Sequence, residues 1–286
     1  MQELDRSAAA ALLPRRDEGA AKWAFGRALL CCGSAGMPGA AALSARAALR
    51  SGAGLCVLAS VPAALAALPV CAPECVLCPL PEGSTGAVAE SGLPVLLREG
   101  ARADGLLFGC GVGISDDGRA LLRGLLAGYG GTLVLDADGL NLLAEEPSLL
   151  RTAAGRVLLT PHRRELARLC GTKEAGPAEA AAFAAKYGVT VLCKGGGGTV
   201  AGPEGPLCRL EAPNSGMAKG GSGDVLAGLA VGLLAQGMAP AEGAALALWL
   251  HARAGALARA DLGARAMLPT DVIAHIGAAF REMERD

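Results

Sequence analysis

Short apolar runs alternate with longer segments of helical pattern along most of the chain. Apolar runs that end at glycine, proline or a polar residue are typical of buried strands. We expect such strands at residues 28–32, 55–59, 74–78, 105–108, 132–135, 157–159 and 189–193. Helices are expected between them, at residues 40–50, 117–126 and 165–170, with a short one starting at Pro62. This alternation predicts an α/β fold, a three-layer α/β/α sandwich with a mostly parallel sheet.

The C-terminal part of the chain shows helical patterns only. Residues 225–236 are apolar on nearly every side, as expected of a helix buried inside a domain. Two more helices are expected at 242–259 and 269–281. The longest apolar stretch, 225–235, is shorter than the about 20 residues that a membrane span needs, so we expect no membrane partner.

Composition narrows the class of protein further. The 286 residues suit one large domain, and we expect a single domain over 1–286 with residues 1–11 as an N-terminal extension. Hydrophobic residues make up 52% and aromatic residues 3%, so the core must consist mainly of Ala, Leu and Val. A net charge of −1 argues against nucleic-acid binding. The acidic N-terminus does not resemble a signal peptide, so we expect a cytoplasmic protein.

The ten cysteines lack paired spacing, which predicts reduced thiols buried as small hydrophobic side chains. Cys71, Cys75 and Cys78 nevertheless have the C-x3-C-x2-C spacing of an iron–sulfur cluster that binds S-adenosylmethionine. Alternatively, residues 74–78 form an ordinary strand whose apolar positions are cysteines. We favour the strand because these cysteines follow two earlier strand–helix units.

A glycine loop precedes the buried helix and predicts an anion site. Gly220, Gly221 and Gly223 have no Cβ, so their backbone can approach a ligand closely. The N–H groups at a helix start and the positive end of the helix dipole favour a phosphate there. Asp224 would repel phosphate, but it could accept the proton of a hydroxyl that is being phosphorylated. The alternative is that Asp224 only caps the helix.

Two further glycine segments follow predicted strands. Gly195–Gly198 are expected to form a loop that a flat or anionic group can approach, and the adjacent Lys194 is either a phosphate contact or a surface lysine. The glycines at 109–113 resemble a dinucleotide fingerprint. Their G-x-G-x-G spacing and their distance from the N-terminus argue against that interpretation.

Polar residues also stand where predicted strands end, the edge at which open α/β sheets bind ligands. Asp136 and Asp138 follow strand 132–135, and could hold Mg²⁺ through water, contact a substrate hydroxyl, or cap the next helix. His162 follows strand 157–159, and could contact a ligand or be structural.

Six segments together resemble one family: residues 26–41, 46–55, 136–143, 160–162, 214–228 and 262–271. They resemble the ADP-dependent NAD(P)H-hydrate dehydratases, and the resemblance extends from about residue 12 to the end of the chain. It implies a ribokinase-like fold and repair of the S form of hydrated NADH and NADPH. ADP or ATP, with Mg²⁺, would phosphorylate the C6 hydroxyl of the damaged ring, and loss of that phosphate would restore the dihydropyridine.

The resemblance also implies roles for individual residues. Asp224 would be the catalytic base, and the hydrate would contact Ala40, Gly111, His162 and Asp224. The nucleotide would be held by Lys194, Gly195, Gly196, Gly197, Gly198, Asn214, Lys219, Gly220, Gly221, Ser222 and Gly223. No residue is assigned as a direct metal ligand. We further expect a homo-oligomer and, because no epimerase domain is present in this sequence, a functional link to a separate NAD(P)H-hydrate epimerase.

Two segments depart from the family pattern. Residues 21–24 read Ala-Lys-Trp-Ala where the family has His-Lys-Gly-Asp, and residues 161–165 read Pro-His-Arg-Arg-Glu where it has Pro-His-Pro-Gly-Glu. We expect both segments to lie near the substrate.

Two other functions use the same features: a ribokinase-like kinase of a small alcohol such as a thiamine precursor, and a non-catalytic nucleotide sensor.

Overall fold

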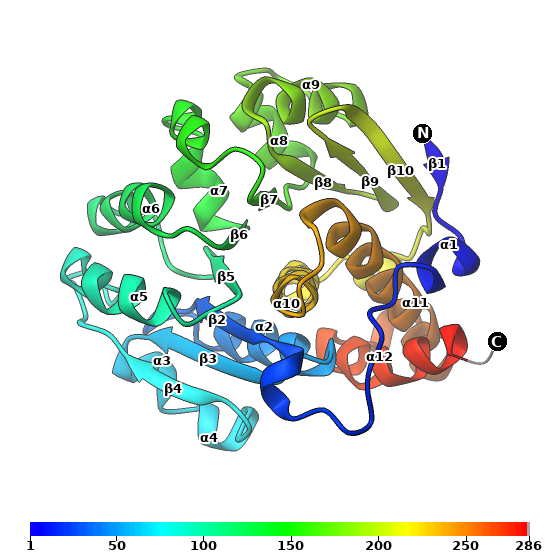
Figure 1. The fold of residues 1–286 in the computed structure, drawn as a ribbon, viewed down its shortest axis with the longest axis horizontal. Coiled ribbons are helices and arrows are strands. Elements are labelled where there is room, and N and C mark those ends of the chain that lie inside the picture. Colours follow the sequence, from blue (N-terminus) through cyan, green and yellow to red (C-terminus); the bar gives the residue numbers. More distant parts are fainter. Residues whose placement is uncertain (285–286) are drawn as a thin grey trace.

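One ten-stranded sheet forms the middle layer of the structure, a computed structural model that describes residues 1–284 (Figure 1). The strands are β1 (Gln2–Glu3), β2 (Arg27–Cys31), β3 (Leu55–Ser60), β4 (Val76–Pro79), β5 (Gly105–Phe108), β6 (Thr132–Leu135), β7 (Val157–Leu159), β8 (Thr190–Lys194), β9 (Gly197–Gly202) and β10 (Gly205–Glu211). Their order across the sheet is β1-β10-β9-β8-β7-β6-β5-β2-β3-β4. All seven predicted strands are present within two residues of their expected bounds.

Helices cover both faces of this sheet. They are α1 (Arg6–Ala10), α2 (Pro38–Arg50), α3 (Pro62–Leu65), α4 (Leu68–Cys71), α5 (Leu93–Gly100), α6 (Asp116–Gly128), α7 (Asp138–Leu143), α8 (Arg163–Cys170), α9 (Pro177–Tyr187), α10 (Ser222–Ala235), α11 (Pro240–Ala266) and α12 (Pro269–Met283). Strand β2 shows why both faces are buried: Ala28 and Leu30 belong to one buried cluster with residues of α2, α10, α11 and α12, whereas Leu29 and Cys31 belong to a second one with residues of α5 to α9. The predicted three-layer α/β/α sandwich is therefore confirmed.

The sheet is parallel except around β9, which runs antiparallel to both β8 and β10. The predicted loop at Gly195–Gly198 is wrong in part, because Gly197 and Gly198 are the first two residues of β9. Gly197 has φ +110°, and a Cβ there would collide with the carbonyl oxygen of Leu210 on β10. These glycines therefore allow two backbones to approach closely within a strand. Only Gly195 and Gly196 form the turn.

The first residues of the chain belong to the same sheet. Strand β1 pairs in parallel with β10, and the Leu4 N–H donates to the Arg209 carbonyl at 2.8 Å. Helix α1 packs near α11 and α12, and the N-terminus lies beside β10 (Figure 1). None of the helices in the described part of the chain combines the length and the apolar character needed to cross a membrane.

Cysteines are more exposed than the sequence suggests. All ten are free, and Cys31, Cys32, Cys56, Cys110, Cys193 and Cys208 are buried as predicted. Cys71 is exposed and three others are partly exposed, so the prediction of burial is wrong for these four. The C-x3-C-x2-C thiols form no metal-ligating group within residues 1–284, and residues 76–79 form a strand instead.

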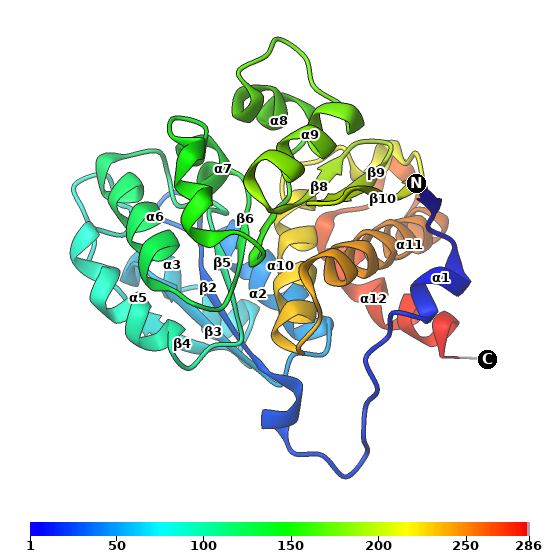
Figure 2. The ribbon, with the colours of Figure 1, turned by 45° about the horizontal axis from the view of Figure 1, so that its top comes forward.

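Helix α10 lies in the centre of the molecule, packed against the sheet and flanked by α2 and α11 (Figures 1 and 2). All its residues from Val225 to Ala235 are buried, as the apolar pattern predicted. Two glycines one turn apart face α2. A Cβ at Gly228 would lie 2.9 Å from the Ala47 Cβ, and one at Gly232 would lie 2.6 Å from the Ala48 carbonyl oxygen. The two helix backbones are therefore in close contact, and no side chain fits between them.

We predict that Gly228→Ala lowers the free energy of unfolding by about 1–3 kcal/mol, because the added methyl group must push α10 away from α2. Gly277→Ala is the matched control, since Gly277 lies in α12 with its nearest neighbour atom 4.0 Å from the new Cβ. This control should gain about 0.5–1 kcal/mol from helix propensity. Urea denaturation measures both variants, and equal effects would contradict the packing argument.

Candidate active site

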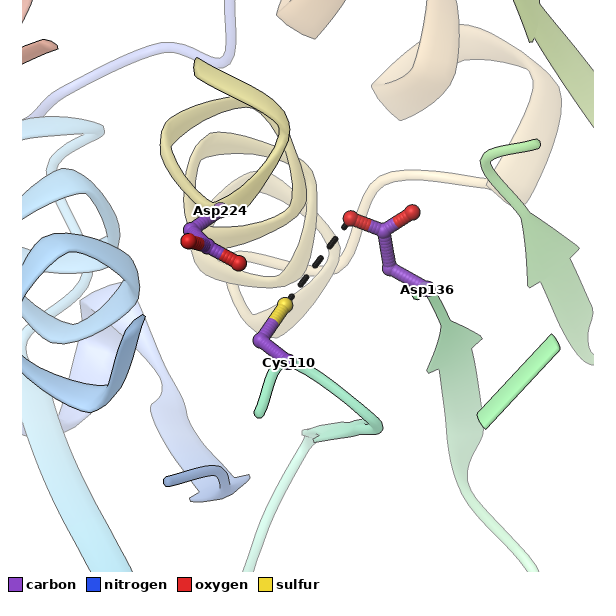
Figure 3. A group of neighbouring side chains, drawn as sticks. All are labelled: Cys110, Asp136 and Asp224. Carbon is purple, nitrogen blue, oxygen red and sulfur yellow. Dashed lines mark hydrogen bonds between the residues drawn. The ribbon is translucent and has the colours of Figure 1, made fainter. Parts of the chain in front are cut away.

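The carboxyl ends of β5, β6 and β8 meet the N-terminus of α10. Cys110 follows β5, Asp136 follows β6, Lys194 ends β8, and Asp224 lies in the first turn of α10. Figure 3 shows the side chains of Cys110, Asp136 and Asp224 directed toward one another, and their ligand atoms all lie within 4.8 Å. The topology thus gathers four ionisable or polar side chains from distant parts of the sequence.

Asp136 and Lys194 form a buried ion pair at the centre of this group. The Lys194 Nζ donates to Asp136 Oδ1 at 2.7 Å, and the side chains are 19% and 2% exposed. Burial acts to lower the pKa of Lys194, but Asp136 and Glu165 raise it, and the net direction is upward. Lys194 is therefore a charged residue of the site, and the alternative of an ordinary surface lysine is excluded.

Asp224 is the carboxylate without such a strong partner. Burial raises its pKa to about 6, and the nearby charges of Asp136 and Asp138 act in the same direction, while Lys194 opposes them. The residue that caps α10 is Gly221, with φ +96° and no side-chain bond, so the capping interpretation of Asp224 is wrong. A carboxylate with a pKa near neutrality is suited to exchange a proton with a ligand.

The glycine loop opens beside this carboxylate. A Cβ at Gly220 would meet nothing within 4 Å, whereas one at Gly223 would lie 3.4 Å from the Lys194 Nζ. The loop is therefore open on one side and close to a positive charge on the other. The free N–H groups at the start of α10 add to this positive potential.

A cavity of about 1010 Å³ extends from the loop, along the groove between α10 and α11. Its lining combines polar residues with apolar ones: His162, Arg164, Lys194, Gly195, Gly196, Gly197, Ala212, Asn214, Met217, Ala218, Lys219, Gly220, Ser222, Gly223, Leu226, Leu248, His251 and Ala252. This volume is at the upper end of the range for small-molecule sites, about 300–1,000 Å³. Nearly all residues that the resemblance assigned to a nucleotide thus line one cavity.

Two of those residues are tied to other parts of the protein. The Lys219 Nζ donates to the carbonyl oxygens of Arg265 and Met267, at 2.8 and 2.6 Å. The Asn214 amide donates to the Gly255 carbonyl at 2.9 Å. Their assigned role as nucleotide contacts stays a prediction. In this structure both side chains anchor the loop to α11 and the turn after it.

The predicted substrate residues form two groups. Ala40 and Gly111 are adjacent, because a Cβ at Gly111 would lie 3.0 Å from the Ala40 Cβ. His162 caps α8, with its Nδ1 accepting the N–H groups of Arg164 and Glu165 at 3.1 and 3.2 Å. It is thus structural through Nδ1, while the residue also lines the cavity.

Asp136 and Asp138 are oriented differently. Asp138 Oδ2 accepts the Gly113 N–H at 2.9 Å, and no side-chain hydrogen bond caps α7 at Ala137. Asp136 accepts from Lys194 and, weakly, from the Cys110 thiol at 3.8 Å (Figure 3). Neither aspartate therefore acts as the predicted helix cap.

Sequence reasoning missed Cys110 and His251. A hydrogen bond with Cys32 and burial raise the pKa of the Cys110 thiol, so it is neutral and can donate to Asp136. His251 lies in α11, where apolar residues are spread over all sides of the helix, so no sequence motif indicated this histidine. The fold places His251 at the cavity and Cys110 beside Asp224.

The departure at residues 21–24 lies far from Asp224, which corrects the expectation that it adjoins the substrate. The short helix η1 (Lys22–Phe25) precedes β2, on the amino edge of the sheet (Figure 2). A Cβ at the next residue, Gly26, would collide with the Ala235 carbonyl at the last turn of α10. Because α10 is about 20 Å long, this segment is that far from the first turn. By contrast, the second segment that departs from the family pattern, residues 161–165, includes Arg164, which lies on the cavity wall.

The parallel sheet, its two helical layers and the glycine loop at a buried helix define the fold of the ribokinase-like superfamily. A ribokinase-like superfamily protein of Enterococcus faecalis is similar to the chain with a TM-score of 0.84 and 26% identity, over 99% of this chain and 96% of that one. The ADP/ATP-dependent NAD(P)H-hydrate dehydratase of Bacillus subtilis, co-crystallised with ATP and Mg²⁺, gives a TM-score of 0.81 and 24% identity, over 99% and 98% of the two chains.

Within this class, residues 28–277 match the family described as NAD(P)H-hydrate dehydratase, and the chain belongs to that family. The ADP-dependent (S)-NAD(P)H-hydrate dehydratase of Xanthomonas campestris is 36% identical over 236 residues, 80% of this chain and 79% of that protein. The bifunctional NAD(P)H-hydrate repair enzyme Nnr of Moorella thermoacetica is 38% identical over 280 residues, 96% of this chain and 53% of that protein. The chain therefore spans about half the length of these bifunctional relatives.

We predict that Lys194→Met destabilises the protein by about 2–4 kcal/mol, because it leaves Asp136 buried without its cation. The double variant Asp136→Asn/Lys194→Met should recover part of this loss, since both charges are then absent. Lys173→Met, at an exposed position, is the control and should change little. Urea denaturation at pH 7 measures all three, and a double variant less stable than Lys194→Met would contradict the ion-pair argument.

We also predict that Asp224→Asn is more stable than the wild type above pH 6. The pKa of Asp224 is about 6 in the folded state against an ordinary value of 3.8, so its ionised form opposes folding. This cost is absent below pH 3.8, develops between pH 4 and 6, and is complete above pH 6, where it amounts to about 1–3 kcal/mol. Thermal denaturation from pH 4.5 to 8 should show the advantage of the variant growing with pH. The exposed Glu204→Gln control should show no such trend.

Proposed function

We propose that this chain is an ADP- or ATP-dependent NAD(P)H-hydrate dehydratase that returns the S form of hydrated NADH and NADPH to the reduced coenzyme. The observation that carries the proposal is the partly buried carboxylate of Asp224, which lies in the first turn of α10 directly after the glycine loop and within 4.8 Å of the ligand atoms of Cys110 and Asp136. Membership of the family supports it, as does the ADP-dependent relative from Xanthomonas campestris.

In the first step Asp224 accepts the proton of the substrate's C6 hydroxyl. The hydroxyl oxygen forms a bond to the terminal phosphorus, and the bond from that phosphorus to the rest of the nucleotide breaks, with the electron pair leaving on the nucleotide. Transfer of the proton to a positioned base contributes about 10²–10⁴ in rate. The N–H groups of Gly220 to Gly223 and the Lys194 ammonium stabilise the charge of the moving phosphoryl group.

In the second step the new phosphate leaves from C6. The lone pair of the ring nitrogen supplies the electrons, and the neighbouring ring carbon then gives a proton to the departing phosphate, which restores the double bond. Since the ring itself expels the phosphate, the protein need not supply a strong acid. The site accordingly offers one carboxylate with a pKa near neutrality rather than a matched acid–base pair.

Mg²⁺, when bound, would neutralise the charge on the phosphates that react. Mg²⁺ prefers oxygen ligands and usually binds to one or two carboxylates, substrate phosphates and water. Asp136, with Asp138 behind it, fits this pattern through water, whereas the Cys110 thiol is a poor ligand. Because Asp136 is already paired with Lys194, we propose that the phosphates supply most of the direct ligands. The Bacillus subtilis structure with ATP and Mg²⁺ supports this cofactor.

We assign the hydrate to the Ala40–Gly111 contact and His162, and the nucleotide to the cavity beside the glycine loop. Only a small residue fits at position 111, because a Cβ there would lie 3.0 Å from the Cβ atoms of Ala40 and Met37. A cytoplasmic location, a homo-oligomeric state and a link to a separate NAD(P)H-hydrate epimerase stay predictions.

The proposal is tested by the near-ultraviolet absorbance of purified protein mixed with NADH hydrate, Mg²⁺ and either ADP or ATP. Return of the NADH absorbance only when nucleotide is present is the expected result. A stable phosphorylated product from a small alcohol would favour the kinase instead, and nucleotide binding without turnover would favour the sensor.

We predict that Asp224→Asn keeps nucleotide affinity and loses at least about two orders of magnitude in turnover, because the base is absent. In the wild type, kcat should fall as the pH drops below about 6, since protonated Asp224 cannot accept the hydroxyl proton. Stopped absorbance assays between pH 5 and 8 and calorimetric titration with ADP measure both effects. An Asn variant with wild-type turnover would remove Asp224 from this role.

A further inference from the structure

A second cavity, of about 270 Å³, adjoins the one assigned to the nucleotide, and the mechanism above gives it no role. Its lining includes Arg163 at the start of α8, Pro177 at the start of α9, and residues of β8, β9 and β10. One of these, Cys193, belongs to the buried cluster with residues of α5 to α9, whereas Leu226 and Leu248 of the larger cavity belong to the cluster with α10 and α11. The two cavities therefore lie toward opposite faces of the sheet.

The turn between β8 and β9 separates the two cavities. Lys194, Gly195 and Gly196 line both of them. A Cβ at Gly195 would lie 3.7 Å from the Arg163 Nε, and one at Gly196 would meet nothing within 4 Å. A single turn without side chains at its two glycines is thus the wall, and Arg163 lies against it in the second cavity.

Neighbouring strands supply the polar floor of the second cavity. Cys193 of β8 pairs with Thr199 of β9, and Thr199 pairs with Arg209 of β10. Directly paired residues of antiparallel strands point to the same face of a sheet, as do residues two apart on one strand, such as Arg209 and Glu211. All four line the cavity, so a hydroxyl and a guanidinium occupy adjacent positions on one surface.

Positive charge exceeds negative charge in this lining. The cationic side chains are Arg163, Lys194 and Arg209, and the one carboxylate is Glu211, which lies 3.3 Å from Arg209. Arg163 forms no ion pair within the described residues 1–284. Burial raises the pKa of the Cys193 thiol, and the charges of Arg163 and Lys194 oppose that rise, so the positive potential reaches the floor. An anionic group would complete this arrangement.

The size and chemistry of the cavity suit a phosphate group rather than a whole nucleotide. Its volume lies below the range of about 300–1,000 Å³ that is typical of small-molecule sites. None of the residues that line it, all within 1–284, is aromatic, so a base would have no ring on which to stack. A phosphate group carries a charge of about −1.5 to −2 near pH 7, and guanidinium groups bind it with two parallel hydrogen bonds.

We propose that the second cavity binds a phosphate-bearing group through Arg163, Arg209 and the Thr199 hydroxyl. The site lies across the Gly195–Gly196 turn from the phosphoryl donor and goes beyond the proposed function. Two sources can bring such a group: the pyrophosphate of the hydrate itself, or a separate phosphorylated metabolite. His162, which precedes Arg163, pairs with Lys194 through the backbone, so the site adjoins a residue that we assign to the hydrate.

The experiment is calorimetric titration of the whole, ADP-saturated protein with pyrophosphate, since ADP then occupies the larger cavity. Arg163→Gln and Arg209→Gln should each weaken pyrophosphate binding about tenfold, through loss of a charge-assisted hydrogen bond. Glu211→Gln should strengthen it about two- to fivefold, because Arg209 loses a competing partner. All three residues are exposed, so these variants should fold as the wild type does.

Arg151→Gln is the matched control. Arg151 is an exposed residue of the short helix η3 (Pro147–Ala153) and does not line the second cavity. The substitution removes the same charge and should leave the Kd of pyrophosphate unchanged.

The repair assay identifies the source of the phosphate group, and this arm alone rests on the proposed function. Pyrophosphate that raises the KM for NADH hydrate at saturating ADP would assign the site to the substrate's own pyrophosphate. Pyrophosphate that binds through the two arginines but leaves this KM unchanged would assign the site to a separate metabolite.

Two results would overturn the assignment. One is that the ADP-saturated wild type binds no pyrophosphate. The other is binding that Arg163→Gln and Arg209→Gln leave unchanged, which would move the anion to the glycine loop. A wild type that binds pyrophosphate through the two arginines but binds no ADP would instead contradict the proposed function and uphold this site.

Discussion

The close contact between α10 and α2 is the constraint on which the rest of the site depends. Helix α10 carries Asp224 and the free N–H groups in its first turn, so its position fixes where a proton and a phosphate can be handled. Gly228 and Gly232 let its backbone reach the backbone of α2, which packs on the same face of the sheet. Since the helix is apolar from Val225 to Ala235, burial of this stretch holds it in place.

Charge balance at the carboxyl edge of the sheet follows from that placement. One buried cation, Lys194, faces the carboxylates of Asp136, Glu165 and Asp224. It bonds directly to Asp136, so that pair is satisfied at 2.7 Å. Asp224 is left with burial and a repelling neighbour, which is why its pKa rises to about 6. The property that suits it to accept a proton is therefore the same one that opposes folding.

The sequence predicted those parts of the fold that are determined locally. Parallel strands covered on both faces are continuous apolar runs, so β5, β6 and β7 could be predicted to the residue. The β9–β10 hairpin could not, because glycine runs are typical of loops, and the close approach of Leu210 to Gly197 depends on the folded sheet. The expected position of residues 21–24 failed for a related reason, since a motif does not show which edge of the sheet it will occupy.

The same distinction between local and long-range features applies to the candidate site. Glycines before an apolar helix predicted the loop and Asp224, because both lie within one short segment. The partners of Lys194 and the cavity position of His251 depend on contacts between residues far apart in the chain, which no pattern displays.

Long-range anchors explain how a glycine-rich loop can hold a fixed shape. Glycine has the largest backbone entropy to lose, so a loop with Gly220, Gly221 and Gly223 is flexible unless its surroundings restrain it. Lys219 restrains it at one point by donating to the carbonyl of Arg265, in the last turn of α11, and to that of Met267 just after the helix, and Asn214 does so upstream through Gly255. Between these anchors the space over Gly220 stays open. The N–H groups are thus positioned before any ligand binds, and the phosphoryl transfer that we propose needs little further ordering of the protein.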